Sequence, residues 1–277
     1  MIVVTGATGN VGRALVGRLV AENRPVRALT RDPEQATLPA AAEVARLDLT
    51  DPAALFKGAS KLFLQVQATG DRTGAVLDAA RAAGVRHVVM LSSGIIREGA
   101  DETHPVYAWH AAIERQVRDS GVEWTFLRPN AFAANARQWA PQIRSGDTVR
   151  GPYAGALTAP IHEGDIAAVA ARALLDDGHT GAVHRLTGPA AVTTGEQIAA
   201  IGRALGRELR FVEVPPDEVG RDLFPHVPPQ MLPGVLKSLA ATVGIRPEIT
   251  MTVEAVTGSP ARTFAEWAVD HRADFTT

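Results

Sequence analysis

The chain has 277 residues and carries 28 basic and 30 acidic side chains, so its net charge at pH 7 is −2. This length fits one large domain or two closely associated ones, and 46% hydrophobic with 21% charged residues is typical of a folded globular protein. A charge this close to zero gives no field that would hold a polyanion, so neither nucleic acid nor an anionic membrane is an expected partner.

The absence of cysteine excludes disulfides, metal sites with thiolate ligands and cysteine nucleophiles. Met1 leads straight into an apolar run with no basic leader, and no apolar stretch reaches the roughly 18 residues of a membrane span. We therefore expect a cytoplasmic protein. No pair of histidines has ligand spacing with a carboxylate, so no metal site is expected.

Short β-branched runs alternate with alanine-rich stretches through the first half of the chain. The apolar runs predict strands at 2–4, 26–29, 61–66 and 87–91. The alanine-rich stretches predict helices at 13–22 and 75–83. Apolar runs this short between helices are typical of a parallel sheet covered on both faces. Repeated βαβ units of this kind predict an α/β fold.

The rhythm loosens after residue 129, although further elements are still predicted: helices at 163–175, 194–205 and 263–272, and strands at 182–186 and 209–214. Eight of the 18 prolines lie between residues 215 and 260. Such an irregular segment suits a lid or pocket wall, and it equally suits a plain surface excursion. Both interpretations stay open at this point.

The segment TGATGNVG, residues 5–12, follows the first predicted strand and enters the first predicted helix. Its glycines allow a tight turn, a close approach of the backbone to a pyrophosphate, and close packing of the helix on the sheet. A glycine repeat alone is weak evidence, and a structural turn is the alternative, but the strand before it and the helix after it give the required context. The residues expected to hold a dinucleotide here are Gly6, Thr8, Gly9, Asn10, Val11 and Gly12.

The second strand ends about 20 residues beyond this loop, where an acidic residue would bind a ribose 2′-hydroxyl and an arginine a 2′-phosphate. Arg31 comes first and favours NADP(H), because a guanidinium matches phosphate. In the alternative, Arg31 pairs with Asp32 or Glu34, and Asp32 accepts the hydroxyl of NAD(H). Asp48 and Leu49, after the third strand, are expected at the adenine; otherwise Asp48 caps the helix that starts near residue 51.

Six further segments carry a family pattern together with the loop: LTRDP at 29–33, LDLTDP at 47–52, HVVMLSS at 87–93, HAAIE at 110–114, GVEWTFLRPNAF at 121–132 and HEGDIAAVAARAL at 162–174. With them the chain resembles, over nearly its whole length, the NmrA-like group of atypical short-chain dehydrogenases/reductases. It looks most like the subgroup with NAD(P)H:quinone oxidoreductases. The resemblance implies a Rossmann-type doubly wound parallel sheet with its dinucleotide-binding region in residues 1–135. Residues 136–277 are expected to form a mixed α/β region that contributes late sheet elements and the smaller C-terminal substrate lobe.

The resemblance also implies roles at matching positions. Arg31 would meet the 2′-phosphate, and three residues would follow the fourth strand beneath the cofactor, namely Gln65, Val66 and Gln67. Ser92 and Ser93 would lie by the nicotinamide ribose, with capping of the following turn as the alternative. The residues implied to line the nicotinamide pocket are Pro129, Asn130 and Phe132.

Short-chain reductases usually carry a lysine four residues after a tyrosine, and its charge lowers the phenol pKa from about 10 so that a proton can be exchanged near neutrality. Here Tyr107 is followed at that spacing by Ala111, and the lysines stand at positions 57, 61 and 237. His110 shares a helical face with Tyr107 if this stretch is helical, and a histidine pKa of about 6.5 suits proton transfer. Tyr107 and His110 are therefore the expected catalytic residues.

Simpler roles are open for the same helix. His110 would then bond to the cofactor amide or to a backbone carbonyl, Glu114 would pair with Arg118 one turn later, and Trp109 would belong to the core. Tyr107 and His110 would in that case line the pocket without moving a proton.

Two functions are compatible with this pattern. The first is a reductase that passes hydride from NAD(P)H to an electrophilic acceptor, such as a quinone or conjugated enone of an aromatic small molecule. The missing lysine favours such an acceptor over a plain ketone, because a phenolate-like product needs less acid assistance. The second is a protein that binds the dinucleotide, senses its redox balance and performs no turnover. The sequence leaves the oligomeric state open.

Overall fold

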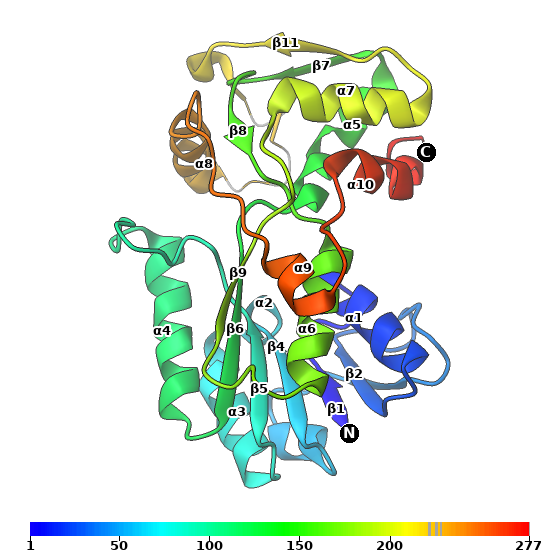
Figure 1. Cartoon of the computed structure of the whole chain (residues 1–277), viewed down its shortest axis with the longest axis vertical. Coiled ribbons are helices and arrows are strands. Elements are labelled where there is room, and N and C mark those ends of the chain that lie inside the picture. Colours follow the sequence, from blue (N-terminus) through cyan, green and yellow to red (C-terminus); the bar gives the residue numbers. More distant parts are fainter. Residues whose placement is uncertain (221–222, 225–226, 228, 277) are drawn as a thin grey trace. The chain divides into compact units, whose positions relative to one another are not determined.

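The computed structural model describes residues 1–220, 223–224, 227 and 229–276 (Figure 1). The chain forms two compact units that are each discontinuous in sequence. The first comprises Met1–Asn130, Glu163–Leu186 and Thr252–Ser259, and the second comprises Ala131–His162, Thr187–Met251 and Pro260–Thr277. The predicted division into 1–135 and 136–277 stays a prediction.

The first unit is built on a seven-stranded parallel sheet with the order β3-β2-β1-β4-β5-β6-β9. The strands are β1 Ile2–Val4, β2 Val26–Thr30, β3 Glu43–Arg46, β4 Lys61–Gln65, β5 His87–Leu91, β6 Glu123–Pro129 and β9 Val183–Leu186. The strand order reverses between β1 and β4, as it does in doubly wound dinucleotide-binding sheets. The predicted Rossmann-type α/β fold is confirmed.

Helices lie on both faces of this sheet (Figure 1). Helices α3 and α4 share one hydrophobic cluster with β4, β5 and β6, whereas α1 packs against α6 on the opposite face. The bounds are α1 Asn10–Ala21, α2 Val66–Thr69, α3 Thr73–Ala82, α4 Pro105–Asp119, α6 Glu163–Leu175 and α9 Thr252–Thr257, with short 3-10 turns at Pro52–Phe56 and Gly70–Arg72. The expected helix at 163–175 is thus observed with the same ends.

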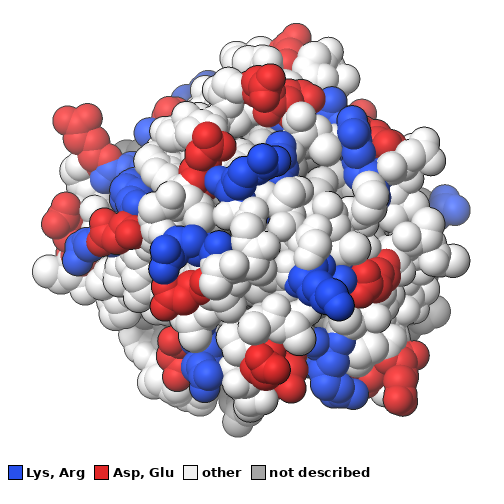
Figure 2. Space-filling model, turned by 90° about the horizontal axis from the view of Figure 1, so that it is seen from below, with Lys and Arg blue, Asp and Glu red and all other residues white. Residues whose placement is uncertain are grey.

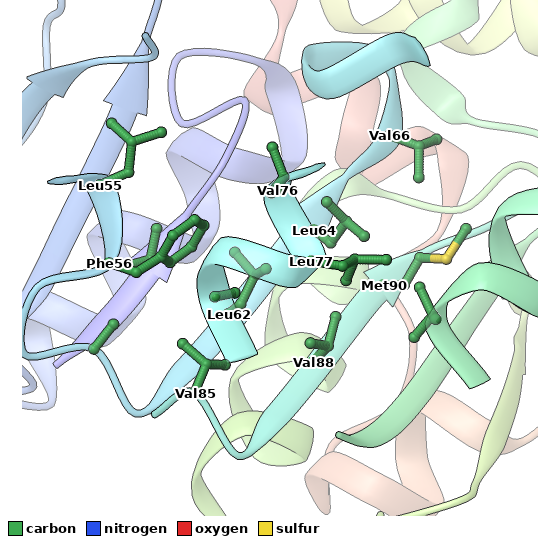
Figure 3. Packing of buried hydrophobic residues seen from close by; sticks show 14 of the residues in the cluster. Leu55, Phe56, Leu62, Leu64, Val66, Val76, Leu77, Val85, Val88 and Met90 are labelled. Carbon is green, nitrogen blue, oxygen red and sulfur yellow. The ribbon is translucent and has the colours of Figure 1, made fainter. Parts of the chain in front are cut away.

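The α3 side of the sheet is filled by alternate strand residues. Leu62 and Leu64 of β4 and Val88 and Met90 of β5 point to the same side and meet α3 (Figure 3). All four are fully buried. Because successive side chains of a strand point to opposite faces, Phe63 and Val89 face the other layer, so the strands read as continuous apolar runs.

The second unit has its own core around Trp267, which is fully buried beside Phe264 and Phe275. Its helices are α5 Ala140–Ser145, α7 Thr194–Leu205, α8 Leu232–Ala240 and α10 Phe264–Asp270, with 3-10 turns at Ala133–Trp139, Pro216–Glu218, Pro229–Met231 and Arg272–Phe275. Its strands form two pairs, the parallel β7 Thr148–Gly151 with β11 Arg210–Glu213 and the antiparallel β8 Leu157–Thr158 with β10 Val192–Thr193.

Two helices of this unit start at capping boxes. Thr193 accepts from the Glu196 amide and Glu196 accepts from the Thr193 amide, and Thr263 and Glu266 repeat the arrangement. Each box satisfies amide groups that the first helical turn leaves without partners, which sets where α7 and α10 begin. The proline-rich stretch 215–260 contains α8 and α9, and its residues 221–222, 225–226 and 228 lie outside the described residues.

Among the residues described, no helix combines the length and the apolar character needed to cross a bilayer. The cytoplasmic location stays a prediction.

Three histidines of the first unit have lowered pKa values because burial disfavours their charged forms. His87 in β5 contacts the Thr125 hydroxyl at 2.9 Å, and this hydroxyl donates to the His179 carbonyl, so the Nε2–H of His87 is the donor. Burial lowers the pKa of His87, of His184 and of His110. The folded unit therefore binds fewer protons at these sites than the unfolded chain below pH 6.5.

We expect the free energy of unfolding to fall as the pH drops from 7.5 to 5.5. A histidine with a lowered folded-state pKa contributes stability that is present above the unfolded pKa and is lost below it, with a slope of at most about 1.4 kcal/mol per pH unit per histidine. Urea denaturation at several pH values measures the slope, which should become smaller in a His87→Gln/His184→Gln variant. A stability that is constant or greater at pH 5.5 would contradict this expectation.

Candidate functional site

The carboxyl ends of the parallel strands meet at one edge of the sheet, and the predicted cofactor residues of the first unit follow these ends. The glycine loop follows β1, Arg31 follows β2, Gln65 ends β4, Ser92 follows β5 and Asn130 follows β6. In open α/β sheets the ligand binds outside this edge, where the strand order reverses. The edge is the candidate cofactor site.

The glycine loop packs so closely on α1 that side chains are excluded. Gly6 has a φ of +62°, which favours glycine, and its carbonyl accepts from the Gly9 amide at 3.0 Å. A Cβ atom on Gly12 would lie 2.1 Å from the Gly6 oxygen. Gly9 is the N-cap of α1 and the first turn contains no acidic side chain. A helix N-terminus of this kind offers amide donors and a positive dipole end, which fits a pyrophosphate.

Threonines and Gln65 hold the loop in place. The Thr5 hydroxyl donates to the Phe63 carbonyl and accepts from the Gln65 amide at 2.7 Å, which ties the loop to β4. A Cβ atom on Gly6 would lie 2.9 Å from Cγ of Gln65, so the two residues are in direct contact. The Gln65 side chain also accepts from the Gln67 amide, which caps the short helix α2 that begins at Val66.

The remaining loop residues connect the glycine loop to β2 and to the first turn of α1. Thr8 and Thr30 hydroxyls lie 3.3 Å apart, which links the loop to the end of β2. Asn10 begins α1 and is exposed, whereas Val11 is buried beneath the first turn. These contacts join three strand ends to one helix terminus.

Arg31 and Asp32 are both exposed at the end of β2. The Arg31 carbonyl accepts from Arg46, and the Asp32 amide lies 3.4 Å from the Thr30 hydroxyl. Within the described part of the chain Arg31 forms no ion pair with Asp32 or Glu34. The surface pairing suggested as an alternative is therefore not seen, and the choice between a 2′-phosphate and a 2′-hydroxyl stays a prediction.

Asp48 closes a turn and does not cap the next helix. Its carboxylate accepts from the Thr50 hydroxyl at 2.6 Å and from the Thr50 amide at 2.9 Å, and these bonds lower the pKa of Asp48. The N-cap of the following 3-10 turn is Asp51. The neighbouring Leu49 is half-buried, and its carbonyl accepts from Arg72 at 2.8 Å. Contact of Asp48 and Leu49 with an adenine stays a prediction.

A buried ion-pair network lies behind the end of β5, and sequence reasoning found only part of it. Glu114 accepts from Arg118 at 3.0 Å, as expected for residues one turn apart. It also accepts from Arg128 Nε at 2.9 Å and Nη2 at 2.6 Å, and from the Ser92 hydroxyl at 2.6 Å. Ser92 is 4% exposed and Glu114 is 1% exposed. Arg128 lies in the segment GVEWTFLRPNAF at 121–132, but no local spacing in the sequence links it to Glu114.

The turn after β5 is fastened to β6. The Gly94 amide donates to the Pro129 carbonyl at 2.8 Å, and a Cβ atom on Gly94 would lie 1.9 Å from Oδ1 of Asn130. The Ser93 hydroxyl accepts from the Ile95 amide at 3.3 Å, so Ser93 has the turn-capping contact that was the alternative to a ligand role. The Asn130 amide donates to Leu186, which holds Asn130 at the strand end.

Tyr107 and His110 lie on α4, which begins with Pro105 after the N-cap His104. The Tyr107 hydroxyl donates to Glu102 at 3.2 Å, and burial together with Glu102 raises the pKa of Tyr107. His110 is 5% exposed, its Nδ1–H donates to the Val106 carbonyl at 2.9 Å, and burial lowers its pKa. The backbone bond weighed for His110 is thus present.

The core position weighed for Trp109 as a simpler alternative is wrong, because this side chain is 37% exposed and contacts the His110 ring edge-on at 4.6 Å between centroids. Phe132 belongs to the second unit, where it pairs with Ile161 in an isolated bridge. The pocket-lining role of Phe132 stays a prediction. The neighbours of Trp109 in the sequence do not indicate that it is exposed, because they belong to both the buried and the exposed face of the helix.

The surface at the opposite, amino end of the sheet has a different character. Figure 2 shows this end of the molecule with basic and acidic side chains interspersed over it. A cavity of about 750 Å³ opens there, and the residues around it include Lys61, Arg81, Glu123 and Asp177. Charges of both signs line it, so it offers no net charge to a nucleotide phosphate.

Comparisons with known proteins agree with this geometry. A family profile described as NAD(P)H-binding matches residues 6–177. The chain is 41% identical to (4-alkanoyl-5-oxo-2,5-dihydrofuran-3-yl)methyl phosphate reductase of Streptomyces griseus, with 99% of each chain covered. It is 35% identical to NAD(P)H azoreductase of Xenophilus azovorans, again with 99% of each covered. It is 28% identical to quinone oxidoreductase 2 of Escherichia coli, with 98% of each covered.

Solved structures show the same fold. The NADPH complex of an NADPH-dependent quinone oxidoreductase from Escherichia coli has a TM-score of 0.79 at 24% identity, covering 98% of this chain and 99% of that one. Triphenylmethane reductase from Citrobacter sp., complexed with NADP(H), has a TM-score of 0.80 at 22% identity with 98% and 99% covered. The chain therefore belongs to the NAD(P)H-binding family and is an NAD(P)H-dependent oxidoreductase.

Proposed function

We propose that this protein reduces an aromatic small molecule that is already electrophilic, such as a quinone or a conjugated enone, with NAD(P)H as the reductant. The observation that carries the proposal is the state of the Tyr107 phenol. Ala111 stands where short-chain reductases usually have a lysine, and burial together with Glu102 raises the pKa of Tyr107 where a lysine would lower it. A phenol with no neighbouring lysine is a weak acid near neutral pH, which favours an acceptor that needs little proton assistance.

The relatives support this class of acceptor. Their names describe reductases of a dihydrofuranone that carries an alkanoyl group, of azo compounds and of quinones. Each of these compound classes contains a conjugated or easily reduced system. The substrate role predicted for the C-terminal lobe stays a prediction.

The residues of the first unit would hold the cofactor as follows. The loop at Gly6, Gly9 and Gly12 and the N-terminus of α1 would bind the pyrophosphate, and Arg31 would bind the 2′-phosphate. Gln65, which contacts Gly6, would lie beneath the dinucleotide. When bound, NAD(P)H supplies a hydride to the acceptor.

Tyr107 and His110 would then have unequal roles. Tyr107 keeps its proton at neutral pH and can move its hydrogen bond from the exposed Glu102 to an acceptor oxygen. His110 is neutral at pH 7 because its pKa is lowered, and its Nδ1–H is engaged by Val106, so its Nε2 is a hydrogen-bond acceptor. His110 would therefore orient a hydroxyl and not protonate the product.

The function is tested by mixing the purified protein and NADPH with a panel of acceptors and following the absorbance of the reduced cofactor at about 340 nm. We expect turnover with naphthoquinones and aromatic enones, and much slower turnover with simple ketones, because a ketone needs an acid at its oxygen. Tight NADPH binding without turnover of any acceptor would contradict the proposal and support the redox-sensing alternative.

We expect Arg31→Ala to weaken NADPH binding by roughly ten- to a hundredfold and to leave NADH binding unchanged, because a charge-assisted contact is worth about 1.5–3 kcal/mol. Isothermal titration calorimetry of both cofactors measures the effect. Arg24→Ala is the control, since it removes another exposed arginine from the same unit. Equal affinities for the two cofactors in both proteins would assign the ribose to Asp32 instead.

We expect Tyr107→Phe to lower turnover of an enone by about 10²-fold and turnover of a quinone by less, because the quinone product is the weaker base. Since the pKa of Tyr107 is raised and that of His110 is lowered, the pH profile of kcat should be flat from pH 7 to 9 and should fall below pH 6.5. His110→Gln should remove the acidic limb. A quinone rate that neither substitution changes would place proton delivery entirely with solvent.

A further inference from the structure

Ser92 has a single hydroxyl proton, and the structure shows where it goes. The Ser92 Oγ lies 2.6 Å from Oε1 of Glu114, and a carboxylate paired with two guanidinium groups accepts hydrogen bonds. Ser92 must therefore be the donor. Its oxygen keeps lone pairs that can accept a hydrogen bond from another group.

Glu114 has no freedom to turn away from Ser92. Arg128 binds both of its oxygens, at 2.9 Å and 2.6 Å, and Arg118 binds Oε2 at 3.0 Å. The same Arg128 donates through Nη1 to the Ile96 carbonyl at 3.0 Å. The carboxylate is 1% exposed, so water does not compete for it. The network holds both ends of the turn after β5, Ser92 at its start and Ile96 near its end.

We propose that Glu114 is a positioning residue that commits Ser92 to accept, and not to donate, a hydrogen bond at the cofactor site. Ser92 then takes a hydrogen bond from a ribose hydroxyl of NAD(P)H and gives none to the oxygen of the substrate. This inference rests on the proposed function for the substrate and on family membership for the cofactor. It deepens that function, because it removes a second potential proton donor from the edge of the sheet.

The consequence for the reaction follows from charge balance. An acceptor that gains a hydride becomes an anion, and one proton, delivered through Tyr107 or from water, completes the reduction. The Ser92 hydroxyl already donates its hydrogen bond to Glu114, and the His110 Nδ1–H already donates to the Val106 carbonyl. Neither donor is therefore available to stabilise an alkoxide. Substrates that delocalise the charge, such as quinones, are therefore reduced well, whereas a plain aldehyde is not.

The test compares Ser92→Ala, Glu114→Gln and their double variant by calorimetric titration with NADPH alone. Each single change should raise the Kd by about 3- to 10-fold, the effect of one lost hydrogen bond, and the double variant should be no worse than either. Arg118→Gln is the matched control. It removes a partner of Glu114 that does not touch Ser92, so the Kd should stay within about twofold of the parent value.

Selectivity gives a second measurement. Glutamine can donate to Ser92 and release its proton, so the ratio of aromatic aldehyde to naphthoquinone turnover should rise in Glu114→Gln and not in Arg118→Gln. If the parent turns over no acceptor, the proposed function fails while the NADPH titration still decides the role of Glu114. Additive effects on the Kd, or an equal effect of Arg118→Gln, would overturn the inference.

A third measurement covers the case in which Glu114→Gln does not fold. NADPH is compared with an analogue whose nicotinamide ribose lacks its hydroxyls. The parent protein should bind the analogue about 3- to 10-fold more weakly than NADPH, and Ser92→Ala should bind the two equally. If the parent does not distinguish the two cofactors, Ser92 accepts no bond from the ribose and the inference is wrong.

Discussion

The parallel pairing of β1 between β2 and β4 is the constraint on which the first unit depends. Val4 lies in register with Ala28 of β2 and with Phe63 of β4, so the three strands end at the same edge of the sheet. Each of the three strands then contributes to a single surface. β1 leads into the glycine loop, β2 into Arg31, and β4 ends at Gln65. A parallel sheet needs helical crossovers between its strands, and those crossovers bury both faces and leave the edge as the place where polar groups can meet a ligand.

The Glu114 network places a buried charge at this edge. A buried carboxylate loses its hydration, and two arginines and one hydroxyl replace it. Removal of the only partner of a buried charge typically costs about 3–5 kcal/mol. Glu114 has two arginine partners, so loss of the partly exposed Arg118 leaves it paired with Arg128. Arg118 also lies 4.7 Å from the centroid of Phe126, so part of its charge rests on an aromatic face. A polar network that is fully satisfied fixes one geometry, which suits a turn that must hold a cofactor.

The sequence predicts the parts of this protein that depend on local spacing. The helices at 163–175 and 194–205 are observed with the expected ends, because periodicity and a capping box are both local signals. The glycine loop was expected at the end of β1 and is found there. The 22-residue separation of Ser92 and Glu114, by contrast, is bridged only when α4 packs beside β5 and β6. No pattern within one helix or strand contains that contact, and the same holds for the histidine contacts around Thr125.

Trp109 gives this enzyme an optical property of its own. The indole is 37% exposed and stands beside His110, whereas Trp267 is fully buried in the other unit and Trp124 is stacked on Phe126 at 4.3 Å. The emission of an exposed indole lies at longer wavelength than that of a buried one, so Trp109 contributes the red edge of the protein's fluorescence. That edge is sensitive to events near α4, and it can be read without a label and without a substrate that changes colour.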